Sequence, residues 1–182
     1  MTTDTQERDL RQEWETPEDF FGVVDAEFDF QIDVCATAEN TKCDDYIGPK
    51  GDQGALMIDA KYPATPWLPS NIRRAWCNPG FSDPFPWMER AYKEAQAHCD
   101  AVIVVMSRIS PSTKWWRNWA MKALEIRLLT GSARSKSRVH FVPPPGVKAS
   151  SNTQENCLII FRPNPHELLP RIWTWDWTKG LP

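Results

Sequence analysis

The sequence predicts an α/β fold in one domain, with a mostly parallel, doubly wound sheet and a C-terminal antiparallel hairpin. Between residues 30 and 130, strand-like segments alternate with segments of helical periodicity, the pattern of strand–helix–strand units. The run 100–106 is apolar almost throughout, as expected of a strand buried inside a parallel sheet. A length of 182 residues is enough for one domain with a sizeable core.

The first half of the chain is predicted to begin with a polar, disordered tail over residues 1–13. Thr16 is the expected N-cap and Pro17 the expected first residue of a helix over 18–27, whose phenylalanines would share one face. The other elements expected in this half are a strand over 30–35, a short helix over 38–44 and a loop over 47–72.

The second half continues the alternation. Trp87, Ala91 and Ala95 recur at helical spacing and predict a helix over 86–98. Strands are expected over 74–77, 100–106 and 125–129, with a tryptophan-containing helix over 112–123. The hairpin would join 139–142 to 157–161, and 171–177 would be an edge strand or a covering segment. We thus expect a domain over 14-170 between the disordered tail 1-13 and a Trp-rich C-terminal tail over 171-182.

Composition narrows the class of protein. No apolar run approaches the 18 residues of a membrane span, and the polar N-terminus does not look like a signal peptide. The five cysteines are odd in number and lack Cys-x-x-Cys spacing, which argues against a zinc site and a disulfide framework. We therefore expect a protein of the reduced bacterial cytoplasm, without a metal and without a membrane partner.

The most informative segment follows the strand over 74–77. There the chain reads Asn78-Pro79-Gly80-Phe81, at a strand's carboxyl end, where ligands bind in open α/β sheets. The side-chain carbonyl of Asn78 and the backbone carbonyl of Pro79 can accept the two hydrogens of an exocyclic amine, while Phe81 stacks on the ring. A base reaches such a site when it is flipped out of the duplex or unpaired. The segment therefore predicts chemistry on a nucleobase amine.

The tetrapeptide resembles the Asp/Asn-Pro-Pro-Tyr/Phe motif of amino-group DNA methyltransferases. Over roughly residues 13 to 163 the chain is similar to the small phage-encoded DNA N6-adenine methyltransferases, the phage Dam-like family. Gly80 departs from this pattern, because the family usually has a second proline there, and glycine loosens the turn. The segments that carry the resemblance are Trp14-Glu15-Thr16-Pro17, Asp33-Val34-Cys35-Ala36-Thr37, Glu39-Asn40-Thr41-Lys42-Cys43, Trp76-Cys77-Asn78-Pro79 and 138–146 (RVHFVPPPG).

The resemblance implies a Rossmann-like methyltransferase fold, S-adenosylmethionine as cofactor and adenine N6 in double-stranded DNA as the target. Asp33 would accept a hydrogen bond from the methionine ammonium, although an N-cap role at a strand-to-helix turn is the alternative. The Gly-x-Gly loop of many methyltransferases is absent, but the small side chains of Cys35 and Ala36 would let the cofactor approach. The implied cofactor-binding residues are Thr16, Pro17, Asp33, Cys35, Ala36 and Asn78. Protection of phage DNA from host restriction is a role that the resemblance suggests.

The charge distribution supports a DNA partner despite a net charge of −3. Residues 1–60 carry sixteen acids and four Lys/Arg, whereas 126–154 contains five Lys/Arg and no acid. Such a patch can bind phosphates even in an acidic protein; a solvated basic loop is the alternative. We expect DNA contacts from the loop 132-156 and from Arg108, which a structural salt bridge could instead hold. The candidate DNA-binding residues are Arg108, Arg134, Lys136, Arg138, Lys148 and Ser151.

Two other functions stay open at this point. The same amine-binding logic would serve a methyltransferase acting on cytosine N4 or on RNA, and only the resemblance favours adenine in DNA. Alternatively, the chain is a catalytically weak DNA-binding decoy that keeps the fold, an option that Gly80 leaves open.

Overall fold

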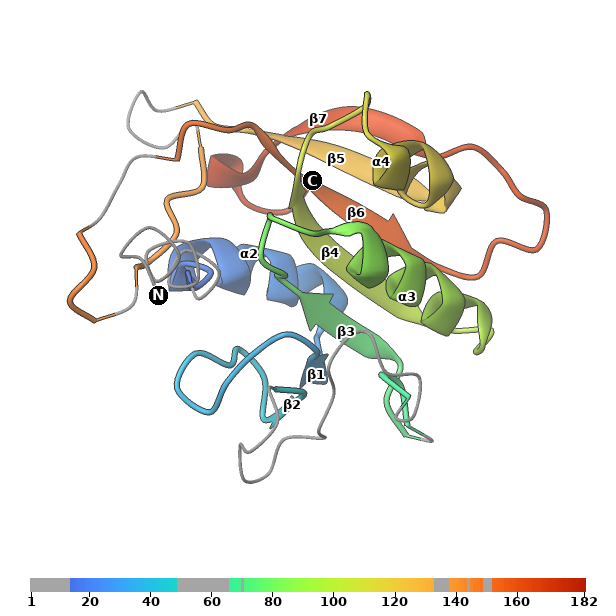
Figure 1. Cartoon of the computed structure of the whole chain (residues 1–182), viewed down its shortest axis with the longest axis horizontal. Coiled ribbons are helices and arrows are strands. Elements are labelled where there is room, and N and C mark those ends of the chain that lie inside the picture. The colour runs from blue at the N-terminus through green and yellow to red at the C-terminus, as the bar shows by residue number, and fades with distance from the viewer. Residues whose placement is uncertain (1–13, 49–65, 70, 133–137, 144, 149–151) are drawn as a thin grey trace, which may run out of the picture.

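A mostly parallel sheet forms the centre of the protein. The computed structural model describes residues 14–48, 66–69, 71–132, 138–143, 145–148 and 152–182. Within them, seven strands lie in the order β2-β1-β3-β4-β6-β5-β7 (Figure 1). All neighbouring pairs are parallel except the two that β6 makes with β4 and β5. The expectation of a mostly parallel α/β sheet is confirmed, and β6 is the strand that runs opposite to the rest.

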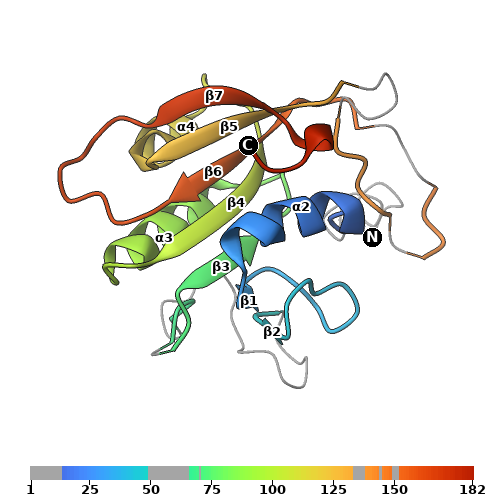
Figure 2. The ribbon, with the colours of Figure 1, turned by 180° about the vertical axis from the view of Figure 1, so that it is seen from behind.

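Helices cover both faces of this sheet. Helix α2 (Glu18–Phe28) buries Phe20, Phe21, Val24 and Phe28 on one face. Helices α3 (Phe85–Gln96) and α4 (Lys114–Asn118) lie on the other, and the two opposite views show the two layers (Figures 1 and 2). Side chains of β4 (Val102–Arg108) alternate between the two cores, as period-two geometry requires.

The start of α2 differs from the prediction. Pro17 is the N-cap, in an extended conformation, and its carbonyl accepts the first helical hydrogen bond from Phe21. Thr16 was expected in that role. Its side chain is buried and its hydroxyl is bonded to Asn78 instead, so a tertiary contact replaces the local cap.

The region after α2 is less regular than predicted. Strands β1 (Ile32–Asp33) and β2 (Asp45–Tyr46) are short, and the expected helix over 38–44 is absent from this described stretch. The Asp33 carboxylate accepts backbone N–H bonds from Cys35 and Lys42, so it closes the segment as a loop. The predicted loop over 47–72 lies mostly outside the described residues.

The centre of the chain follows the prediction with one break. Strand β3 (Arg74–Cys77) and helix α3 form where expected. The helix predicted over 112–123 is split into α4 and a 3-10 turn at Ala120–Lys122. Trp119 leaves the helical backbone region at the break, where its ring packs 5.7 Å from Tyr92 and 6.2 Å from Phe85 of α3.

The predicted C-terminal hairpin is not confirmed. Strand β6 (Asn156–Phe161) lies between β4 and β5 (Glu125–Thr130), whereas segment 139–142 contributes only a bridge between Val142 and Glu15. Strand β7 (Arg171–Asp176) lies at the edge of the sheet, parallel to β5, and the 3-10 turn Trp177–Lys179 follows it. Trp177 packs edge-on against Phe20, with ring centroids 5.3 Å apart, so the C-terminal segment contributes to the core.

Three findings concern membrane spans, disulfides and metal sites, which the sequence analysis also considered. None of the helices in the described part of the chain is long and apolar enough to cross a bilayer. All five cysteines are free thiols. Among the described residues, no group of three or more His, Cys, Asp or Glu side chains is arranged to hold a metal ion.

Candidate active site

Three neighbouring strands end at one edge of the sheet. Strand β1 ends at Asp33, β3 leads directly into Asn78, and β4 ends at Arg108. Because these strands are parallel and adjacent in the order β1-β3-β4, their carboxyl ends meet. This edge is where open α/β sheets bind ligands. The sheet therefore brings into one region three residues, Asp33, Asn78 and Arg108, that are 30 to 75 positions apart in the sequence.

Asn78 is held through the nitrogen of its side-chain amide. Its Nδ2 donates to Thr16 Oγ1 at 3.0 Å and to the Trp14 carbonyl at 3.4 Å. Thr16 is only 3% exposed, so this contact is shielded from water. No described residue donates to the Asn78 carbonyl oxygen, which keeps its capacity to accept a hydrogen bond. The structure thus brings Thr16 into contact with Asn78, two residues that the sequence analysis had assigned to the site separately.

Phe81 is half-buried and lies beside a second aromatic ring. The ring of Phe141 is 5.7 Å away at an interplanar angle of 80°, an edge-to-face pair. Phe141 is placed by its neighbour Val142, whose backbone makes two 2.9 Å hydrogen bonds with Glu15. Sequence reasoning missed Phe141, although it lies within the segment 138–146 that carries the resemblance. Its aromatic character beside a Pro-rich turn was the available signal.

Gly80 does not adopt the left-handed backbone conformation. The described glycines with positive φ are Gly146 and Gly180, and Gly80 is not among them. Pro79 is buried just before it. A positive φ is therefore not the reason for glycine at position 80.

Asp33 is a buried carboxylate at the end of β1, 3% exposed. Oδ1 accepts from the Cys35 N–H at 3.1 Å and Oδ2 from the Lys42 N–H at 3.3 Å. Burial raises the pKa of this carboxyl from 3.8 to about 7, against the opposing effect of the two N–H bonds and the Lys42 charge. No described cationic side chain is bonded to it. The neighbouring Ala36 is buried, and burial raises the pKa of the half-buried Cys35 thiol.

Lys42 ties this loop to the start of α2. Its nearly buried Nζ donates to the carboxylates of Glu15 and Glu18. The segment 14–18 consequently contacts three parts of the site: Asn78 through Thr16, the loop below Asp33 through Lys42, and the Phe141 segment through Glu15. Sequence reasoning assigned no role to Glu15 or Lys42, although both lie within segments that carry the resemblance.

The candidate DNA-binding residues fall into three groups. Arg108 stands at the end of β4, and no described residue forms an ion pair with it. Arg138 is paired with Glu155 at 2.6 Å, which offsets its charge, and Lys148 is exposed. Arg134, Lys136 and Ser151 lie outside the described residues.

Comparison with known proteins identifies a family that matches nearly the whole chain. The family model described as DNA N-6-adenine-methyltransferase (Dam) matches residues 2–173. A curated relative, the DNA N-6-adenine-methyltransferase of Haemophilus phage HP1 (strain HP1c1), is 28% identical over 166 residues. That match covers 90% of this chain and 86% of the phage protein.

Proposed function

The chain belongs to the DNA N-6-adenine-methyltransferase (Dam) family, and we propose that it transfers a methyl group from S-adenosylmethionine to adenine N6 in double-stranded DNA. The observation that carries the proposal is the orientation of Asn78. Its amide nitrogen donates to Thr16, which leaves the carbonyl oxygen available to accept, and Pro79 and Phe81 follow within three residues of the chain. Two acceptors and a stacking ring suit a planar base that carries an amine.

These residues can raise the reactivity of the target nitrogen. An exocyclic amine on an aromatic ring is a poor nucleophile because its lone pair is conjugated into the ring. Hydrogen bonds to the Asn78 and Pro79 carbonyls favour a more tetrahedral nitrogen, and the Phe81 ring fixes the plane of the base. The chain contributes positioning and electrostatic stabilisation. A base in a duplex must be flipped out to reach such a site.

The residues around Asp33 fit the proposed cofactor. A buried carboxylate without a bonded cationic side chain would be neutralised by an ammonium group, such as that of a methionine moiety. When bound, S-adenosylmethionine supplies a methyl group that its sulfonium activates. Asp33 would hold the ammonium, and the small side chains of Cys35 and Ala36 would admit the ligand, with Thr16 and Pro17 completing the pocket on a Rossmann-like fold.

The DNA would approach from the side of β4 and the loop 132-156. Arg108, Arg138, Lys148 and the basic residues of that loop would position the phosphates, which orient a duplex without reading its sequence. For Arg138 this requires that Glu155 releases the guanidinium or shares it with a phosphate. Protection of a phage genome from host restriction is a purpose consistent with this reaction.

A methylation assay tests the proposal. The purified chain is incubated with labelled S-adenosylmethionine and DNA from a host that lacks adenine methylation, and the product is digested to nucleosides. We expect the label in N6-methyladenine. Label in N4-methylcytosine would show that the substrate is cytosine, and transfer to RNA alone would show that the substrate is RNA. Binding of cofactor and DNA without any transfer would identify a decoy.

Cofactor binding should depend on pH through Asp33. Its carboxyl is largely protonated below its raised pKa of about 7, and only the ionised form attracts an ammonium. Affinity should therefore rise several-fold between pH 5.5 and 6.5, and binding at pH 6.5 should release protons. The cofactor's own amine is almost fully protonated at these pH values.

Calorimetry in two buffers of different ionisation enthalpy measures that proton release. The control is Asp33→Asn, which has no carboxyl to titrate and should bind with an affinity that is flat over this range. If the wild type and the Asn variant show the same pH dependence, Asp33 does not contact the ammonium.

A further inference from the structure

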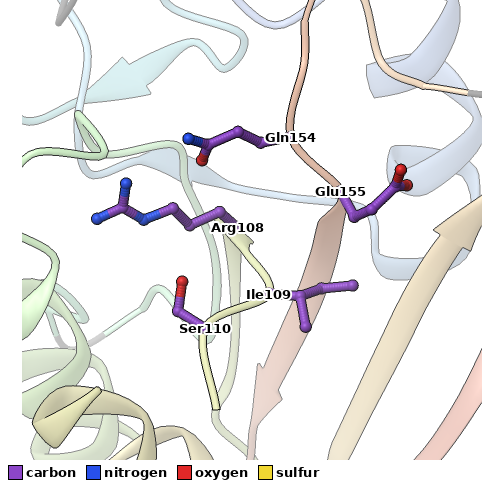
Figure 3. Close-up of a pocket in the computed structure, with 5 residues that line it drawn as sticks. All are labelled: Arg108, Ile109, Ser110, Gln154 and Glu155. Atoms are coloured by element: carbon purple, nitrogen blue, oxygen red, sulfur yellow. The ribbon is translucent and has the colours of Figure 1, made fainter. Parts of the chain in front are cut away.

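An open pocket of about 440 Å³ lies at the end of β4, where β6 begins. It is lined by Arg108, Ile109 and Ser110 from the chain after β4, and by Gln154 and Glu155 just before β6. Figure 3 shows the side chains of Arg108 and Gln154 extending to the same side, with the Ser110 hydroxyl directed toward Arg108. Glu155 and Ile109 point the other way. The polar side of the pocket therefore carries three side chains that can donate hydrogen bonds, namely Arg108, Ser110 and Gln154.

The position of this pocket follows from the strand order. Strand β3, which leads into Asn78, lies between β1 and β4. The Asp33 end of β1 is thus on one side of Asn78, and Arg108 is on the other. The last β3–β4 pair is Cys77 with Val105, which sets Arg108 beside the loop that follows Asn78. A ligand in the pocket would flank the Asn78–Phe81 segment on the side away from Asp33.

Arg108 is the charged side chain in the pocket for which no described residue serves as an ion-pair partner. Its Nε is buried and has no hydrogen-bond partner among the described residues. The nearby carboxylate of Glu155 does not neutralise it, since Glu155 is bonded twice to Arg138, from Nε at 2.9 Å and from Nη2 at 2.6 Å. A guanidinium that is partly desolvated and unpaired favours an anionic ligand.

We propose that this pocket binds a phosphodiester of the target strand, next to the flipped base. Arg108 supplies the charge, and Gln154 and Ser110 supply neutral donors to the phosphate oxygens. This inference rests on the proposed function and names the subsite that holds the strand while Asn78 holds the base. A phosphate in the pocket would fix the sugar–phosphate backbone beside the Asn78–Phe81 segment, and so help to keep the base extruded.

The test is the salt dependence of DNA binding, measured by fluorescence anisotropy with a labelled duplex. Arg108→Gln should weaken binding about tenfold near 0.1 M salt. It should also reduce the slope of log K against log salt by about one, the value for the loss of one phosphate contact. The matched control is Arg162→Gln, because Arg162 is exposed and follows the opposite end of β6. Its slope should equal that of the wild type.

A second variant covers the case in which Arg108→Gln does not fold. Gln154 is exposed, so Gln154→Glu should fold normally and repel a phosphate, which weakens DNA binding several-fold. Asn71→Asp adds the same charge at an exposed position before β3 and should have no such effect.

Three results would overturn the subsite. The first is an Arg108→Gln slope equal to that of the wild type. The second is a Gln154→Glu affinity equal to that of Asn71→Asp. The third is an Arg108 variant that loses affinity for S-adenosylmethionine and keeps DNA affinity, because the pocket would then belong to the cofactor. Binding is measured without methyl transfer, so an inactive wild type would refute the proposed function and leave this comparison intact.

Discussion

Asn78→Ala should lower the rate of methyl transfer by about 100- to 1,000-fold, the usual cost of deleting one hydrogen-bonding group that stabilises a transition state. The side-chain carbonyl would accept from the reacting amine, and its position depends on the bonds from Nδ2 to Thr16 and to the Trp14 carbonyl. Alanine removes both the acceptor and its anchor. The measurement is single-turnover incorporation of labelled methyl groups into DNA.

Two further variants separate chemistry from folding. Asn78→Asp keeps an acceptor oxygen but loses the donation to Thr16, so it should retain more activity than the alanine variant. Asn71→Ala changes an exposed asparagine before β3 and should leave the rate unchanged. Because Asn78 is only half-buried, the alanine variant should melt within a few degrees of the wild type. An alanine variant with the wild-type rate would remove Asn78 from the mechanism.

Arg127→Ala should destabilise the protein by about 3 kcal/mol, which for a chain of this size lowers the melting temperature by roughly 6–12 °C. Arg127 is only 4% exposed in β5. Its guanidinium pairs with Glu27 of α2 at 2.6 Å and with Glu125 at 2.8 Å. It also faces the rings of Phe28, Trp173 and Trp175 at 5.3 to 5.4 Å. The substitution leaves two carboxylates without their partner and opens a gap between α2, β5 and β7.

The matched control is Arg74→Ala. Arg74 pairs with Asp29 at 2.6 Å, but the two side chains are 36% and 87% exposed, so water screens the pair. Loss of such a pair costs about 1 kcal/mol or less. Thermal and urea unfolding of the two variants give the comparison. Equal losses would mean that the buried network around Arg127 contributes no more than a surface ion pair.

Arg127 also shows a limit of charge patterns. In the sequence it belongs to the acid-free segment 126–154, where it counts toward a basic patch for phosphates. In the structure its guanidinium is buried and donates two hydrogen bonds to Glu27, which is 100 positions away. Arg138 is similar, because Glu155 just beyond the segment pairs with it. A count along the chain does not reveal which cations have partners.

Local patterns were sufficient for most elements. The apolar run of β4, the spacing in α3 and the phenylalanine face of α2 follow from periodicity, and these elements formed where predicted. Elements that depend on long-range contacts were predicted poorly. The loop after β1 is closed by Asp33, and segment 139–142 is bonded to Glu15 and not to β6.

The sequence by itself determined the α/β class, the covering of both sheet faces by helices, and the position of Asn78–Phe81 after a buried strand. These features follow from patterns among residues that are close together in the sequence. Only the tertiary structure decided the strand order, the bond between Thr16 and Asn78, the pairing of Phe81 with Phe141 and the unpaired state of Arg108 among the described residues. The physical reason is that a side chain's partner is chosen by packing across the sheet. Residues 62 positions apart meet because strand β3 and the start of α2 share one edge, and no local pattern encodes that distance.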